Sequence, residues 1–192
     1  MIDELLPDSV VDLVDSGCGT GYYAAELLAR RPALRALELD VSADAVVGAV
    51  RATGAPGVVA DVWRALPVRS ERADAVLCVF APRNAAEFAR VLRPGGRLVV
   101  ATPAPQHLAQ LRDSGRLIGM QADKLDRLDD TLAPWFSLDA RRSSRFDLEL
   151  SDTEVDEISA MGPSGHHGAL SDDRAVSTTV TVAIDVSVYT RR

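Results

Sequence analysis

Apolar runs alternate with amphipathic stretches along the first hundred residues of the chain. Five short runs rich in Val, Leu and Ala have the character of buried strands, and they cover 10–14, 34–39, 58–60, 73–80 and 97–101. Apolar residues recur at helical spacing in the segments between them, which cover 22–30, 43–51 and 85–92. Strands that alternate with helices in this way predict a doubly wound α/β fold with a mostly parallel sheet.

The pattern changes after residue 101. Helical spacing returns over 105–111 and 124–132, and we interpret 105–145 as a helical insertion that forms a lid over the substrate site. A sixth strand is predicted at 146–150. Alternating apolar and polar residues over 178–190 predict a long antiparallel last strand.

Two further features complete the expected organisation. Ser151 and Glu154 form a capping box, which predicts a helix directly after the sixth strand. With that helix, the pattern predicts a single domain over 1–192, built on a seven-stranded sheet whose last strand is antiparallel.

Three glycines follow the first predicted strand at the spacing G-x-G-x-G, at Gly17, Gly19 and Gly21. A dinucleotide-binding turn has the spacing G-x-G-x-x-G, and its third glycine would fall on Tyr22. Asp15 precedes the turn, where a carboxylate suits a cofactor with a cationic amino group better than a pyrophosphate. The sequence therefore favours a nucleoside cofactor of another kind over a nicotinamide, although a nicotinamide oxidoreductase remains an alternative.

Asp40 ends the second apolar run, about twenty residues after the glycine turn. A carboxylate at this place can accept hydrogen bonds from both hydroxyls of a ribose. Ligands of open α/β sheets bind outside the carboxyl ends of the strands. That rule nominates four segments for the site, which are 15–21, 40–42, 61–63 and 80–84.

The pattern Asp-x-Gly-x-Gly-x-Gly of residues 15–21 resembles motif I of the class I S-adenosylmethionine-dependent methyltransferases. The resemblance implies a Rossmann-like fold and S-adenosylmethionine as cofactor. It implies that Asp61 accepts from the adenine amino group, unless it only caps a turn, and that the Val62 N–H donates to the ring. The residues expected to bind the cofactor are Asp15, Gly17, Cys18, Gly19, Gly21, Tyr22, Asp40, Val41, Asp61, Val62 and Phe80.

Three residues are candidates for the transfer itself. In this family the edge that follows the fourth strand faces the transferred methyl, so Phe80 is expected to stack on a planar acceptor and Pro82 to stiffen the loop. His107 is a candidate base for an N–H or O–H nucleophile, although a helix-capping or packing role is the alternative.

A narrower resemblance comes from the segments 40–42, 80–82, 87–96, 101–108 and 161–167. They look like the guanine-N1 methyltransferases of 23S rRNA, which include macrolide-resistance proteins. This implies rRNA modification and antibiotic resistance. That family carries a zinc-binding module ahead of its catalytic domain, and we expect this chain to lack it. A small-molecule acceptor, or a repurposed domain that binds the cofactor without methyl transfer, is the alternative.

Composition limits the partners and the compartment. The net charge of −7 and the isoelectric point near 4.9 weigh against tight RNA binding by the chain alone. Arg141, Arg142 and Arg145 form a small basic cluster that could touch phosphates or be solvated. No apolar run is long enough to span a membrane, and no signal peptide is evident, so we expect a cytoplasmic protein. The two cysteines suggest neither a disulfide nor a metal site, and a dimer is compatible with the sequence.

Overall fold

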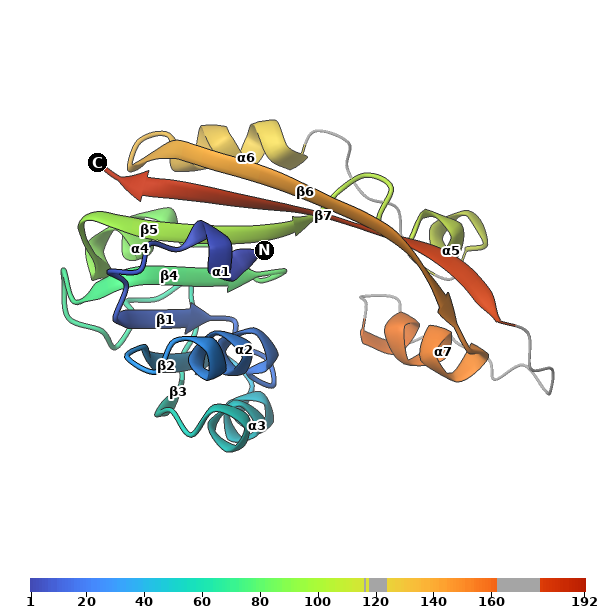
Figure 1. Ribbon diagram of the computed structural model, residues 1–192, viewed down its shortest axis with the longest axis horizontal. Coiled ribbons are helices and arrows are strands. Elements are labelled where there is room, and N and C mark those ends of the chain that lie inside the picture. The colour runs from blue at the N-terminus through green and yellow to red at the C-terminus, as the bar shows by residue number, and fades with distance from the viewer. Residues whose placement is uncertain (116, 118–123, 162–176) are drawn as a thin grey trace. The chain divides into compact units, whose positions relative to one another are not determined.

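The computed structural model describes residues 1–115, 117, 124–161 and 177–192 (Figure 1). Residues 162–167, part of a segment that carries the narrower resemblance, lie outside these residues. The chain forms two compact units. The first comprises 1–102, 125–142 and 186–192, and the second comprises 103–124 and 143–185. Within the described ranges, no helix combines the length and apolar character that a bilayer crossing requires.

Seven strands form one sheet in the order β3-β2-β1-β4-β5-β7-β6. The strands are β1 (Asp12–Ser16), β2 (Arg35–Asp40), β3 (Gly57–Val59), β4 (Ala73–Val79), β5 (Leu92–Pro103), β6 (Phe136–Leu150) and β7 (Thr178–Arg191). The helices are α1 (Ile2–Leu5), α2 (Tyr22–Arg30), α3 (Ala43–Thr53), α4 (Ala85–Val91), α5 (Ala109–Asp113), α6 (Lys124–Leu132) and α7 (Asp152–Met161).

Strands β1 to β5 are parallel, and β7 runs against β5, as the arrows in Figure 1 show. The register of β1 on β2 pairs Asp15 with Glu38, and that of β2 on β3 pairs Asp40 with Val59. The carboxyl ends of β1, β2 and β3 therefore meet at one edge of the sheet. The predicted fold, a mostly parallel seven-stranded sheet with an antiparallel last strand, is confirmed.

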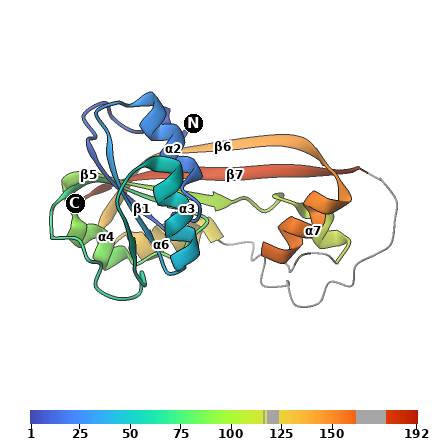
Figure 2. The same ribbon diagram turned by 90° about the horizontal axis from the view of Figure 1, so that it is seen from below.

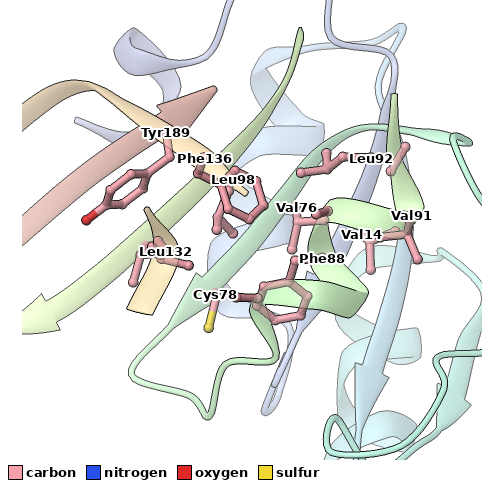
Figure 3. Close-up of a cluster of buried hydrophobic side chains, with 14 of the residues drawn as sticks. Val14, Val76, Cys78, Phe88, Val91, Leu92, Leu98, Leu132, Phe136 and Tyr189 are labelled. Atoms are coloured by element: carbon pink, nitrogen blue, oxygen red, sulfur yellow. The ribbon is translucent and has the colours of Figure 1, made fainter. Parts of the chain in front are cut away.

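A continuous apolar core lies on one face of the sheet in the first unit. Figure 3 shows Val14, Val76 and Cys78 from β1 and β4 packed against Phe88 of α4. Tyr189 of β7 belongs to the same cluster and is 2% exposed. Side chains that alternate with these on β1 and β2 point to the opposite face, which α2 and α3 cover.

Helices α2 and α3 lie side by side on that second face (Figure 2). The side chain of Ser42 accepts a hydrogen bond from the Ala45 N–H at 3.3 Å and so caps α3, as its place before the helix predicts. Gly54 ends α3 in the left-handed conformation, with φ +68°. These two residues fix the length of the helix that packs beside the glycine turn.

Two predicted strands begin earlier in the structure. The fifth begins at Leu92 instead of 97, and its pairing with β4 jumps from Leu92 to Arg97 in a bulge. The sixth strand begins at Phe136 instead of 146, so the last ten residues of the expected helical insertion are extended.

Long-range side-chain contacts within the first unit explain the early start of β6. Arg141 donates to Asp129 at 2.7 Å, to the Ser187 hydroxyl at 2.7 Å and to the Tyr189 hydroxyl at 3.1 Å. Arg141 is thus held by its neighbours, and Arg142 pairs with Glu4 at 2.9 Å. Two of the three arginines in the predicted basic cluster therefore already have acidic partners.

The second unit has its own small core. Leu111 of α5, Leu150 of β6, Val155 of α7 and Val180 of β7 are buried together. The capping box that the sequence predicts for α7 is confirmed, because both the N–H and the hydroxyl of Ser151 donate to Glu154, at 2.8 and 2.7 Å.

Candidate functional site

The glycine turn begins directly where β1 ends and is tied to the end of β2. The N–H groups of Gly17 and Cys18 both donate to the carbonyl of Leu39, at 2.8 and 3.0 Å. Gly17, Gly19 and Gly21 have φ values of +76°, +53° and +79°, a region that residues with a side chain rarely adopt. The backbone of the turn therefore requires glycine at three alternate positions.

Two of these glycines also make close contacts that any side chain would prevent. A Cβ on Gly17 would lie 2.3 Å from the Cβ of Ala81, and one on Gly21 would lie 2.8 Å from the Cα of Ala49 in α3. A Cβ on Gly19 would meet nothing within 4 Å. The turn is thus pressed against neighbouring elements at its two ends and open at its middle, where a ligand has room.

Asp40 lies beside that open middle, with its carboxylate held by the backbone. One oxygen accepts from the Gly19 N–H at 3.0 Å, and the other accepts from the Ser42 N–H at 2.9 Å. Because each carboxylate oxygen can accept a second hydrogen bond, these contacts orient the group and leave acceptor capacity for two hydroxyls.

The loop after β3 contains Asp61, Val62 and Trp63. One oxygen of Asp61 accepts from the Trp63 N–H at 3.0 Å, and the carboxylate also lies 3.6 Å from Arg64. Asp61 therefore caps a turn, and its carboxylate keeps acceptor capacity for a further hydrogen bond.

Asn84 connects this loop to the one after β4. Its side-chain N–H donates to the Val62 carbonyl at 3.0 Å, and its side-chain oxygen accepts from the Glu87 N–H, which caps α4. The sequence placed Asn84 in a candidate segment without assigning it this role, and an Asn directly before a helical pattern was the available signal.

Large apolar side chains are exposed on four loops or helix starts at this edge. Tyr22, Val41, Trp63 and Phe80 expose 66%, 72%, 67% and 46% of their surface. Phe80 also has a left-handed backbone, with φ +52°, an uncommon conformation for an aromatic residue. Exposed apolar groups gathered at one edge of a sheet suit a ligand with flat, apolar faces. Pro82 is exposed on the same loop as Phe80.

Two carboxyl groups are buried beneath the turn. Asp15 and Glu38 are register partners on β1 and β2, and they are 2% and 0% exposed. Burial first, and then the charges of Glu38 and Asp40, raise the pKa of Asp15 well above its usual range. Burial raises the pKa of Glu38 to about 7, against an opposing hydrogen bond from the thiol of Cys18. Glu38 was not among the predicted site residues, although a charged residue inside the apolar run 34–39 was the available signal.

Neither cysteine has the character of a nucleophile. Cys18 and Cys78 are free and buried, and burial raises the pKa of each thiol to about 12. In the described part of the chain, His, Cys, Asp and Glu side chains nowhere gather in threes as metal ligands would.

His107 belongs to the second unit. Its Nδ1 accepts a hydrogen bond from the Ala183 N–H at 3.3 Å, and burial, aided by Arg112, lowers its pKa. A neutral imidazole whose Nδ1 accepts carries its proton on Nε2. Nε2 then has no lone pair, and the lone pair of Nδ1 is occupied by the Ala183 N–H. The ring can accept a proton only after the hydrogen bond from Ala183 breaks.

Comparison with known proteins identifies the domain. Residues 14–100, which run from β1 to β5, match the family described as a methyltransferase domain. The chain contains a methyltransferase domain. The prediction of this family from the glycine turn is confirmed, and S-adenosylmethionine is the cofactor of the family.

Two curated relatives of the methyltransferase domain differ in what they methylate. The 23S rRNA (guanine(748)-N(1))-methyltransferase of Streptomyces fradiae is 43% identical over 162 residues, which are 84% of this chain and 57% of that protein. The malonyl-[acyl-carrier protein] O-methyltransferase of Methylococcus capsulatus is 36% identical over 118 residues, which are 55% of this chain and 42% of that protein. The chain therefore spans about half the length of these relatives.

A solved structure supports the same fold. The YcgJ protein from Bacillus subtilis matches with a TM-score of 0.62 at 15% identity, and the match covers 96% of this chain and 93% of that one.

The residues present fit the cofactor of this family. The turn is open at Gly19, Asp40 is held with spare acceptor capacity, and the two carboxyls of Asp15 and Glu38 lie beneath the turn. An acidic interior suits a cofactor that carries a positive sulfonium and an ammonium group, because opposite charges stabilise each other where water is excluded.

Proposed function

We propose that this chain transfers a methyl group from S-adenosylmethionine to N1 of a guanine in ribosomal RNA. The observation that carries this proposal is the 43% identity to a 23S rRNA guanine-N1 methyltransferase across 84% of the chain. The glycine turn and Asp40 lie within residues 14–100, which match the methyltransferase domain. Such an acceptor would place the reaction in the cytoplasm.

In this proposal four loops at the carboxyl edge of the sheet hold the cofactor. The turn from Gly17 through Cys18 and Gly19 to Gly21 lies along the methionine part, above Asp15. Asp40 accepts from the ribose hydroxyls with the oxygens that Gly19 and Ser42 orient. Tyr22, which is exposed at the start of α2, flanks this part of the site.

The loop after β3 holds the base of the cofactor. Its position is fixed by the bond from Asn84 to the Val62 carbonyl. Asp61 accepts from the adenine amino group with acceptor capacity that the Trp63 N–H leaves, and the Val62 N–H donates to the ring. Val41 or Trp63, both exposed, covers one face of the adenine.

The bound cofactor supplies an electrophilic methyl group on a sulfonium sulfur. The protein's contribution is mainly position and exclusion of water. Phe80 presents its exposed ring for a flat acceptor, and Pro82 restricts the loop that carries it. Guanine N1 must also lose a proton, for which His107 is the candidate base. In that role, Nδ1 of His107 gives up the hydrogen bond from the Ala183 N–H and accepts the proton of the guanine instead.

The experiment that tests the proposal is methyl transfer from labelled S-adenosylmethionine to protein-free 23S rRNA. We expect label in the RNA and a reverse-transcription stop at one guanine, because a methyl on N1 blocks base pairing. Cofactor binding without label in the RNA would overturn the proposed acceptor. Asp40→Ala is the inactive control.

A small acid acceptor is the second candidate. It is favoured by the net charge of −7, which repels the RNA backbone, and by the similarity to an enzyme that methylates a malonyl group. The same labelled cofactor, offered with a malonyl thioester in place of RNA, would then label a base-labile ester.

A further inference from the structure

The acidic pair of Asp15 and Glu38 beneath the glycine turn takes no part in the methyl transfer step itself, and its environment is unusual. Glu38 is fully buried, and the Cys18 thiol, a weak donor, is the one group among the described residues that approaches its carboxylate as a hydrogen-bond partner. Its register partner Asp15 is 2% exposed. An ionised carboxylate that is buried without a partner costs several kcal/mol, and such groups normally neutralise instead.

Among the residues that the structure describes, no positive side chain compensates this pair. The titratable groups that face it are Cys18 from the turn, Asp40 from the end of β2 and Tyr23 from α2, none of which carries a positive charge. The charged residues of α3, Asp44 and Arg51, are exposed, and β3 has no titratable residue. With no positive side chain beside it in the described ranges, the pair can be neutralised in the free protein by binding a proton.

We propose that Asp15 and Glu38 together hold a proton in the free protein, and that the positive charge of the bound cofactor displaces it. The proton leaves to solvent when the cofactor binds and returns when the cofactor departs, so no bond to the cofactor is made or broken. Glu38 thereby tunes the site for a cationic ligand. The inference rests on the glycine turn as the cofactor site, and it is independent of the methyl acceptor.

The consequence is a pH-dependent affinity with a defined sign. As the pH rises, the free-energy cost of removing the proton from the pair falls, so the cofactor binds more tightly. Burial raises the pKa of Glu38 to about 7. Between pH 5.5 and pH 7, where the cofactor's own ammonium stays charged, we expect the affinity for S-adenosylmethionine to rise about five- to tenfold.

The test is calorimetry of the whole chain with S-adenosylmethionine at pH 6, in two buffers that differ in ionisation enthalpy. The difference between the buffers gives the protons released, which we expect to be about half to one per cofactor bound. Glu38→Gln should reduce both the release and the pH dependence, and Glu26→Gln, on the exposed face of α2, should change neither.

Proton release by the wild-type protein tests the inference even if the Glu38→Gln variant does not fold. No net proton release by the wild type would overturn the inference, and so would release that Glu38→Gln leaves unchanged. S-adenosylhomocysteine, which lacks the sulfonium charge, refines a positive result. Release with both ligands assigns the displacement to the ammonium, and release with S-adenosylmethionine alone assigns it to the sulfonium.

Discussion

Gly17 and Gly21 are glycines for two reasons at once. Both have positive φ, and both bring the turn so close to another element that a Cβ would clash, with Ala81 in one case and Ala49 in the other. Two glycines of the G-x-G-x-G spacing are therefore required because α3 and the loop after β4 pack closely against the turn. This packing fixes the backbone of the cofactor site before any ligand binds.

The cost of a side chain at Gly21 can be separated from the cost of the backbone angle alone. Gly21→Ala adds both strain and a contact at 2.8 Å, whereas Gly54→Ala adds strain at φ +68° in open space. We expect Gly21→Ala to lower the free energy of unfolding by about 2–4 kcal/mol, and Gly54→Ala by about 1 kcal/mol. Urea unfolding measures both, and equal losses would contradict the close contact.

Residues whose role depends on local chemistry could be predicted from the sequence. The turn glycines and Asp40 follow from spacing and from the end of an apolar run. Glu38 and Asn84 could not be assigned in the same way. The burial of Glu38 depends on packing by α2 and α3, and the second hydrogen bond of Asn84 reaches a carbonyl twenty-two residues away.

At the scale of elements, α4 organises the loops of the site. Its cap, Asn84, binds the Val62 carbonyl, and its first turn presents Glu87, which accepts from the Leu66 N–H at 2.7 Å. Arg90 donates to the Val68 and Leu66 carbonyls from the next turn. One short helix thus holds the segment from 62 to 68 by its backbone.

Asn84→Ala tests this role of α4. It removes a helix cap and the bond to Val62 together, so we expect a loss of about 1–2 kcal/mol in stability and a several-fold weaker affinity for S-adenosylmethionine. Ser151→Ala, which removes the cap of α7 in the second unit, should cost a similar stability and leave the affinity unchanged. Equal affinities in the two variants would show that the cap does not support the site.

The strands among the first hundred residues could be predicted because buried parallel strands give continuous apolar runs, whereas the short helix α1 was not predicted. Helices α2 and α6 have the predicted bounds. The sixth strand was predicted only over its last five residues. Its first ten residues were missed because most of them are polar or charged side chains at the surface, and Arg141 contacts Asp129, Ser187 and Tyr189 only in the folded protein.

At the scale of the whole molecule, buried acidity links stability to pH. A carboxyl whose pKa is raised in the folded state binds its proton more tightly there than in the unfolded chain. Unfolding then releases a proton, and stability falls as the pH rises from the unfolded to the folded pKa. For Glu38 that window runs from about 4.5 to about 7, and Asp15 acts in the same direction.

Glu38→Gln should remove part of this pH dependence in the absence of cofactor. We expect the variant to be more stable than the wild type by on the order of 2–3 kcal/mol at pH 8, and to differ little at pH 4.5. Urea unfolding at both pH values gives the comparison, with Glu26→Gln as the matched surface control. If the difference in the free energy of unfolding between the variant and the wild type is the same at pH 8 and at pH 4.5, Glu38 ionises without cost in the folded protein, which would contradict this prediction.

Calorimetric titration with S-adenosylmethionine of the wild type and of Asp40→Ala tests most directly the claim that the carboxyl edge of the sheet binds the cofactor. Asp40 is held by Gly19 and Ser42 with spare acceptor capacity for a ribose. We expect one cofactor per wild-type chain, and at least tenfold weaker binding by the variant, a difference of about 1.4 kcal/mol, with the unfolding temperature nearly unchanged. Equal affinities in a folded variant would contradict the claim.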